Sequence, residues 1–185
     1  NRALVYSDKI KYSVIKLGKD NENFKDKKII IASKLIKKVS EECNFKEFKI
    51  LKEFNGAELK NTICSHPLKK MGYNYDVPML QGDFVTLEQG TGIVHAAPSH
   101  GPDDFNLCLK HGIKASNTIN DGGLYSEEIP FFSGVHIFKA DNQVIEKLAE
   151  NKSLLGNGKL QHSFPHSWRS KAPLVYRATS QWFIS

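Results

Sequence analysis

The sequence predicts a β-rich α+β domain: a twisted or barrel-like sheet with about three helices at its periphery. Short stretches rich in β-branched and aromatic residues outnumber helical patterns, as in residues 1–17, 29–31 and 77–87. Hydrophobic residues make up 40% and charged residues 25%, which is ordinary globular usage. The length of 185 residues suits one compact domain, so we expect residues 1–185 to form a single domain.

Strands dominate the first third of the predicted structure. Alternation in residues 1–17 indicates a hairpin-like pair of strands that turns at residues 7–9. Residues 29–31 are expected to form a short buried strand, after which Ser33 can cap a helix that runs to about Cys43. Residues 45–66 return to a strand pattern with a break at residues 55–56.

The remainder is predicted to alternate strands with two more helices. Residues 77–87 indicate an edge strand because Pro78 cannot donate to a ladder, and residues 92–96 a second strand. Pro102 suits the first turn of a helix that stops at Gly112. The patterns further predict a tight turn at 121–123, a strand at 135–138, a helix at 142–150, and strands at 162–164 and 174–176.

Composition argues against a membrane-spanning or disulfide-stapled protein. The longest apolar runs, residues 28–32 and 129–132, are far shorter than the roughly 20 residues of a spanning helix. The first residues show no signal-peptide pattern. Three cysteines at spacings of 21 and 44 fit neither a disulfide framework nor a zinc knuckle. We therefore expect a cytoplasmic protein with no membrane partner.

The formal charge of +6 is unevenly distributed. Residues 1–60 carry 15 basic and 9 acidic residues, residues 61–150 carry 6 and 11, and residues 151–185 carry 5 and 0. Two basic ends are expected to approach a polyanion while the middle receives something cationic. Solvated lysine-rich surface is the alternative interpretation.

The chemistry-bearing residues concentrate in the segment 90–104. Gly90 and Gly92 flank Thr91 and permit a tight turn with close approach of the backbone to a ligand. The strand that follows ends at His95.

Beyond a chain reversal at residues 98–101, Asp103 and Asp104 enter the first turn of a helix, where free amides and the helix dipole favour an ionised carboxylate. Asp104 and His95 can then line a small pocket for a primary ammonium group. An N-terminal helix cap is the alternative for Asp104, and core packing is the alternative for His95.

Two other site types are weaker. His95, His100 and Asp104 are metal-ligand types, but their spacing matches no zinc pattern, and we predict no metal. Cys108 falls on the apolar face of its predicted helix, where nothing activates a thiol. The sequence also has no glycine-rich phosphate loop.

Segment 90–104, read as Gly-Thr-Gly-x-Val-His-x-Ala-Pro-x-His-Gly-x-Asp-Asp, resembles the signature of the editing domain inserted into isoleucyl-tRNA synthetases. The histidine at position 95, followed by Ala97-Pro98 and His100-Gly101, distinguishes it from the valine and leucine editing domains. Further matching pieces occur in the same order over nearly the whole chain: residues 1–4, 56–59, 66–67, 82–86, 135–140, 162–165, 168–169 and 177–183.

The resemblance implies the fold of class I synthetase editing domains and hydrolysis of valine wrongly esterified to the isoleucine tRNA. One methylene separates the two amino acids, a difference worth only about 1–3 kcal/mol, and isoleucyl-tRNA synthetase is the standard example of a second, size-excluding site. By the resemblance, Asp104 holds the α-ammonium and His95 excludes isoleucine. The other implied substrate-binding residues are Gly90, Thr91, Gly92 and His100.

The resemblance also implies the partners: the 3′ acceptor end of the tRNA carrying a misacylated amino acid, and the rest of a parent synthetase. We expect phosphate contacts from Lys159, Arg169, Lys171 and Arg177. The tryptophan at position 168 is expected to pack in the core, and residues 177–185, which include Trp182, to begin the return to the parent catalytic domain.

No catalytic side chain and no cofactor are expected within the chain. The nucleotide signatures that use ATP and Mg²⁺ belong to the absent catalytic domain. The family's threonine-rich strand precedes the match at residue 1, so we expect an N-terminally truncated domain that lacks part of the hydrolytic site. Two alternatives remain open: a non-catalytic module that binds the tRNA acceptor end, and a metal-dependent hydrolase at His95, His100 and Asp104.

Overall fold

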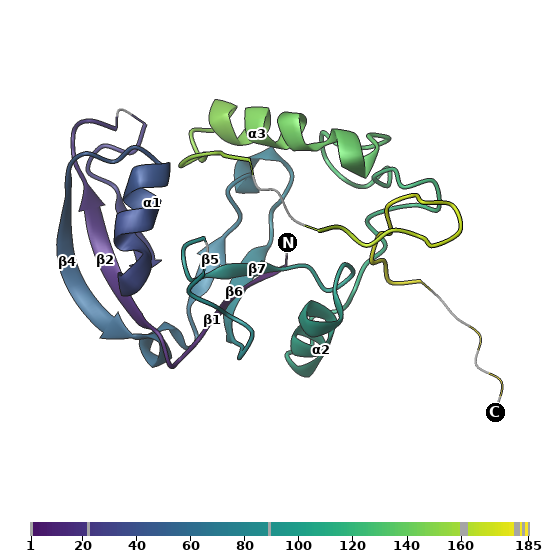
Figure 1. Cartoon of the computed structure of the whole chain (residues 1–185), viewed down its shortest axis with the longest axis horizontal. Helices are drawn as coiled ribbons and strands as arrows, with labels where there is room; N and C mark the ends of the chain where they lie inside the picture. Colours follow the sequence, from purple (N-terminus) through teal and green to yellow (C-terminus); the bar gives the residue numbers. More distant parts are fainter. Residues whose placement is uncertain are drawn as a thin grey trace. The chain divides into compact units, whose positions relative to one another are not determined.

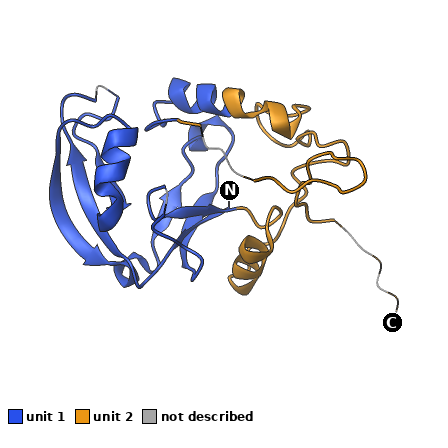
Figure 2. Ribbon diagram, in the orientation of Figure 1, with its two compact units in different colours: residues 1–96, 144–157 blue, residues 97–143, 158–185 orange. Residues whose placement is uncertain are grey.

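The computed structural model describes residues 2–21, 23–88, 90–159, 163–179, 182 and 184. The chain divides into two compact units (Figure 2). Unit 1 comprises Asn1–Ala96 and Val144–Asn157, and unit 2 comprises Ala97–Gln143 and Gly158–Ser185.

Unit 1 contains a four-stranded mixed sheet with the strand order β5-β6-β1-β7 (Figure 1). The central strand β1 pairs in parallel with β6 and antiparallel with β7. Because β5 pairs with the other side of β6, the expectation that this segment is an edge strand is wrong. Pro78 is accommodated opposite Ile63 of β5, which is three residues long. The strands are β1 (Ala3–Tyr6), β5 (Ile63–Ser65), β6 (Asp76–Gln81) and β7 (Val94–Ala96).

A second, antiparallel sheet in unit 1 has the order β3-β2-β4. Its strands are β2 (Lys11–Leu17), β3 (Lys28–Ala32) and β4 (Phe48–Asn55). The predicted hairpin of residues 1–17 is therefore wrong, since β1 and β2 belong to different sheets. The buried Tyr12 hydroxyl accepts a hydrogen bond from the Ser7 amide at 3.1 Å and so fixes the passage between the sheets.

Helix α1 (Ile36–Glu42) covers one face of this second sheet (Figure 1). A one-turn 3-10 segment (Ser33–Leu35) precedes it, and Ser33 does not cap it. The Ser33 hydroxyl instead lies 2.7 Å from the Ser13 hydroxyl. Apolar side chains of β2, β3 and the helical segment share one core, and each fully buried one contributes about 1.5–3 kcal/mol. They include Ile15, Leu17, Ile31, Leu35, Ile36 and Val39.

Two further α-helices bring the number in the described residues to the expected three. Helix α2 (Pro102–Lys110) lies in unit 2, and α3 (Asp141–Glu150) contains the boundary between the units. Within unit 1, Asn151 donates a hydrogen bond to the Pro67 carbonyl, which ties the segment after α3 to the loop before β6. Shorter 3-10 turns occur at Gly56–Leu59, Lys69–Met71 and Ile137–Lys139.

Unit 2 is built mainly of turns and isolated bridges. Bridges join Ile119 to Tyr125, Leu124 to His136 and His166 to Pro173. The predicted strand at 135–138 is thus a single bridge followed by a 3-10 turn, and 174–176 is not a strand. Segment 135–138 pairs only through His136 with Leu124, and segment 174–176 forms no bridge with a described residue. Of the predicted strand at 162–164, residue 162 lies outside the described residues.

Among the helices of the described ranges, none has the length and apolar composition needed to cross a bilayer.

His66 lies in an aromatic cluster in the loop between β5 and β6. Its ring stacks on Tyr73 at 4.6 Å and tilts against Tyr75 at 5.4 Å. The Leu68 amide donates to His66 Nδ1 at 3.1 Å, which requires an unprotonated Nδ1. Burial lowers the pKa of His66 from 6.5 to about 4, so the folded state keeps this imidazole neutral.

We predict that this histidine makes stability pH-dependent. Between pH 6.5 and 4, His66 is protonated in the unfolded chain but stays neutral in the folded chain. The free energy of unfolding therefore falls as the pH falls through that window. Because the ring is partly exposed, we expect a loss of about 1 kcal/mol. Urea unfolding at pH 7 and pH 4.5 measures it, with His66→Asn as the non-titrating control. Equal pH dependence in both proteins would contradict the assignment.

Candidate functional site

The turn at residues 90–92 is clamped to the end of β3. Gly92 has a φ of +77°, and a Cβ added there would lie 2.4 Å from the Ala32 Cβ. The Ala32 amide donates to the Thr91 carbonyl at 2.8 Å, and the Tyr12 hydroxyl donates to the Gly92 carbonyl at 2.8 Å. The close backbone approach predicted for a ligand is thus made, at Gly92, by the protein itself. Gly90, at φ +70°, has open space where a Cβ would be.

His95 lies in β7, opposite Leu4 of β1, at the edge of the four-stranded sheet. Its side chain is exposed, which does not support the core-packing alternative. The strand placement expected from the sequence is confirmed. His95 belongs to unit 1 and Asp104 to unit 2, and their predicted joint role stays a prediction.

Asp104 lies in the first turn of α2 and is half-buried. Neither its side chain nor any other caps this helix. Instead, Asp104 Oδ2 accepts a hydrogen bond from the backbone amide of Ala97 at 2.8 Å. The carboxylate therefore turns back onto the loop that precedes the helix, and Oδ1 bonds to no described residue. An acid with one oxygen fixed and one open suits an incoming ammonium group.

His100 is held on both sides of its ring. Its Nδ1 lies 3.0 Å from the Tyr176 carbonyl, and its Nε2 lies 2.9 Å from the Thr118 hydroxyl. A carbonyl only accepts, so Nδ1 carries the proton, and in the neutral ring Nε2 accepts from Thr118. The neighbouring Ser99 hydroxyl donates to the Ser116 carbonyl at 2.6 Å. His100 therefore braces the loop of residues 98–101, and both of its nitrogens are occupied.

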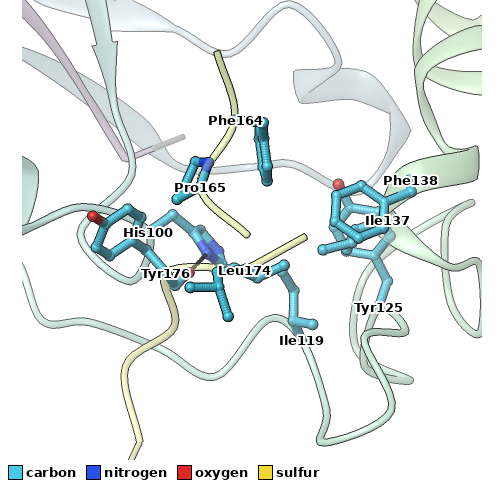
Figure 3. Close-up of a pocket in the computed structure, with 10 residues that line it drawn as sticks. His100, Ile119, Tyr125, Ile137, Phe138, Phe164, Pro165, Leu174 and Tyr176 are labelled. Atoms are coloured by element: carbon cyan, nitrogen blue, oxygen red, sulfur yellow. Dashed lines mark hydrogen bonds between the residues drawn. The ribbon is translucent and has the colours of Figure 1, made fainter. Parts of the chain in front are cut away.

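A cavity of about 340 Å³ opens beside His100 in unit 2 (Figure 3). Its walls are mainly aromatic and aliphatic, and Tyr125 is partly buried there, with a pKa raised by burial and by Asp141. No contiguous sequence pattern marks this cavity, because its walls come from six separated segments. Its lining residues are His100, Ile119, Tyr125, Ile137, Phe138, Phe164, Pro165, Leu174, Val175 and Tyr176.

A second hollow, of about 420 Å³, runs along the start of α2. The loop of residues 98–101 and the start of α2 form one side of it, and residues 176–179 form the other. The Ala178 amide donates to the Ser99 carbonyl at 3.0 Å, which fixes this segment beside the loop. Its lining residues are Pro98, Ser99, Gly101, Pro102, Phe105, Asn106, Tyr176, Arg177, Ala178 and Thr179.

The four basic residues predicted to bind tRNA differ in their surroundings. Arg177 lies at the second hollow, donates to the Ile119 carbonyl and pairs with Asp121 at 2.6 Å. Arg169 lies over the ring of the adjacent Trp168, 5.0 Å from its centroid. Lys159 and Lys171 are exposed.

Trp168 is 78% exposed, so the expectation that it packs in the core is wrong. The tight turn of residues 167–172, closed by the hydrogen bond from the Ser167 amide to the Ala172 carbonyl, holds it outward. Trp182 is also exposed.

The metal and thiol alternatives gain no support from the described residues. No three His, Cys, Asp or Glu side chains among them gather closely enough to hold a metal ion. Cys43, Cys64 and Cys108 are free thiols. Burial raises the pKa of each thiol. The negative charge of Asp104 raises the pKa of Cys108 further. A raised pKa disfavours the nucleophilic thiolate.

Comparison with known families identifies the family of this chain. The family profile "Leucyl-tRNA synthetase, editing domain" matches residues 15–148 of the chain. The chain belongs to this editing-domain family. The resemblance inferred from segment 90–104 is thereby confirmed.

The similar proteins include isoleucine–tRNA ligases that align with the whole of this editing domain. The ligase of Pelagibacter ubique (strain HTCC1062) is 60% identical over 185 residues, and that of Gluconobacter oxydans (strain 621H) is 42% identical over 199 residues. Both alignments cover 100% of the chain but 20% and 21% of the relatives. The chain thus spans about a fifth of the length of the curated relatives it matches.

A solved structure shares the fold of this editing domain. "The crystal structure of GlLeuRS-CP1" superposes with a TM-score of 0.65 at 15% sequence identity, over 86% of this chain and 79% of that one. The predicted α+β class is confirmed, and the predicted single sheet is a mixed sheet and an antiparallel sheet in the described residues.

We predict that the two glycines of the signature turn tolerate alanine unequally. Gly90→Ala should lower the free energy of unfolding by about 1–2 kcal/mol, because a residue with a Cβ must adopt the left-handed backbone conformation. The added methyl group itself meets open space. Gly92→Ala should cost about 2 kcal/mol more, because its methyl group also collides with Ala32. Urea unfolding of the two variants measures the difference, and equal losses would show that the contact with Ala32 does not constrain the turn.

Proposed function

We propose that this editing domain hydrolyses valine from mischarged isoleucine tRNA and spares isoleucine by size. The family and the isoleucine–tRNA ligase relatives support the class of substrate. The observation that carries the proposal is the carboxylate of Asp104, which is anchored to the Ala97 amide and keeps one oxygen open. An aminoacyl ester always carries an α-ammonium group, and that oxygen is its natural acceptor.

His95 supplies the size limit in this proposal. It is an exposed imidazole in the edge strand β7, shortly before the loop of residues 98–101. A rigid ring on a strand can exclude one methylene, which a binding pocket alone discriminates by only about 1–3 kcal/mol. The turn of residues 90–92, which precedes this strand in the chain, is fixed by its hydrogen bonds to Ala32 and Tyr12.

Hydrolysis requires a water molecule that attacks the ester carbonyl while the ribose hydroxyl leaves. We assign no side chain of this chain as the base, and no cofactor is proposed for the step. Among the described residues, the roles of Asp104 and His95 are to hold and to select the ester.

The tRNA end is proposed to reach the domain along unit 2. The hollow beside α2 begins next to the Asp104 turn, and Arg177 lies in its wall. Trp168 with Arg169 offers an exposed stacking surface of the kind that binds unpaired bases. The rest of a parent synthetase is the second proposed partner, in keeping with a cytoplasmic setting.

The exposed Trp168–Arg169 pair also favours a second candidate, a module that binds the acceptor end without catalysis. Deacylation of valyl-tRNA by this chain, compared with a version extended upstream, separates the two. Release of valine by either protein supports the editing proposal. Tight binding with no release by both supports the second candidate.

We predict that Asp104→Asn weakens binding of a non-hydrolysable valyl-adenosine mimic by about 10- to 100-fold, since a charge-assisted hydrogen bond is worth about 1.5–3 kcal/mol. Asp103→Asn, the same change one residue earlier on the same exposed helix turn, is the matched control and should bind as the unaltered chain does. Calorimetric titration measures both affinities. Equal affinities for the two variants would rule out the ammonium role.

We predict that His95→Ala, placed in the parent-length enzyme, lets the site attack correctly charged isoleucyl-tRNA. Removing the imidazole makes room for the extra methylene, while valyl-tRNA remains a substrate. Release of radiolabelled isoleucine and valine from the two tRNAs measures the change. If isoleucyl-tRNA stays as stable as with the unaltered enzyme, the steric role of His95 is wrong.

A further inference from the structure

The outer face of the second sheet in unit 1 carries a row of lysines that no predicted site explains. Lys16 of β2 lies directly opposite Lys28 of β3 on one side and Lys49 of β4 on the other. Residues opposite each other in adjacent strands project from the same face. The three ammonium groups therefore lie on one face, in a row about 10 Å across, which is two strand spacings.

This face is the one that α1 leaves uncovered. Helix α1 packs with Ile15 and Leu17 of β2 and with Ile31 of β3. Lys16 lies between Ile15 and Leu17 in β2, so its side chain projects from the opposite face. The next rung of the face contains Val14 and Ile30, which are both partly exposed. The rung after that, Tyr12 and Ala32, is buried and bonded to the turn of residues 90–92, so the exposed part of the face is the lysine row and its apolar neighbour.

Little negative charge compensates the row. Lys16 pairs with Asp26 at 2.8 Å, whereas Lys28 and Lys49 form no ion pair with a described residue. Lys16, by hydrogen bond and charge, and then Lys25 and Lys19 hold the pKa of Asp26 below its usual range. Several lysines therefore surround this one carboxylate.

The other acidic side chains nearby that the structure describes do not form ion pairs with the row. Glu47 lies beside Gly18, one rung beyond Lys16 and Lys49, and pairs with no described lysine. Asp20 accepts hydrogen bonds from the backbone amides of Lys46 and Glu47. Glu53 lies opposite Ser13, and so on the other face of the sheet.

A row of like charges in direct register destabilises a sheet. The neighbouring positions show that the chain can neutralise a lysine where it needs to: Lys52, one rung away, pairs with Glu58 at 2.7 Å. Leaving Lys28 and Lys49 open costs stability and provides a surface for a ligand with regularly spaced negative charges. A nucleic-acid backbone has this chemistry.

We propose that the outer face of the β3-β2-β4 sheet, through Lys16, Lys28 and Lys49, binds the phosphate backbone of RNA. The surface lies in unit 1, whereas the proposed contacts of the acceptor end lie in unit 2. The identity of that RNA as the tRNA substrate rests on the proposed function. The role of the face is to hold a duplex or single-stranded stretch by charge, without reading bases.

The test compares two double variants of the full chain that remove the same charge. Lys28→Gln/Lys49→Gln removes the open ends of the row. Lys34→Gln/Lys37→Gln is the matched control, since both of its lysines are exposed in the helical segment that covers the opposite face of the sheet. Fluorescence anisotropy with a labelled isoleucine tRNA transcript at 50–200 mM salt gives the slope of log K against log salt.

We expect the slope of the row variant to be shallower by about 2, at about 1 per phosphate-binding lysine, and that of the control to be unchanged. We also expect the row variant to unfold at the same or a higher temperature at low salt, because like-charge repulsion is relieved. A weaker but well-folded binder cannot be explained by damage to the sheet. Equal slopes for the two variants, or binding of phosphatidylserine vesicles in place of RNA, overturn the proposal.

Deacylation by the parent-length enzyme keeps this test distinct from the editing proposal. With the row variant, we expect KM for valyl-tRNA to rise and the rate at saturation to hold. An unaltered enzyme that releases no valine, together with a slope difference between the variants, overturns the editing function but leaves the RNA surface standing. Normal deacylation by the unaltered enzyme, together with equal slopes for the two variants, supports the editing function and overturns the RNA surface.

Discussion

The hydrogen bond from the Ala97 amide to the Asp104 carboxylate is the interaction on which the account of this domain depends. A carboxylate in the first turn of a helix usually satisfies the free amides of that helix. Here it bonds to the loop that precedes the helix instead, which ties α2 to the residue that directly follows β7. The bond fixes one oxygen and leaves the other for a cation. A structural bond and the proposed recognition site thus share one side chain.

The two proposed contacts with the substrate use opposite charges in separate parts of the chain. The acidic middle, with 11 acidic and 6 basic residues in 61–150, contains the carboxylate proposed to hold the ammonium of the amino acid. The basic first third supplies the lysine row on the outer sheet face. Aminoacyl-tRNA itself has this polarity, a cation at the tip of a polyanion. Under these two proposals, one ligand accounts for the uneven charge along the sequence and for the like-charge repulsion in the lysine row.

Local signals predicted much of this from the sequence: Pro102 and Gly112 bracket α2, and the glycines at 90 and 92 mark a real turn. Choices that depend on distant partners could not be predicted. Nothing in residues 1–17 shows that β1 pairs with β6 and β7 while β2 joins another sheet. Trp168 has core-like chemistry, yet a tight turn holds it in solvent. The cavity beside His100 collects residues from positions 100 to 176 and has no contiguous signature.

A crystal structure of the domain with a non-hydrolysable valyl-adenosine mimic tests the central claim most directly. The account predicts that the α-ammonium nitrogen lies within hydrogen-bonding distance of Asp104 Oδ1, with the bond from Ala97 to Oδ2 intact. A mimic bound with its ammonium group in solvent, or on another carboxylate, would contradict it.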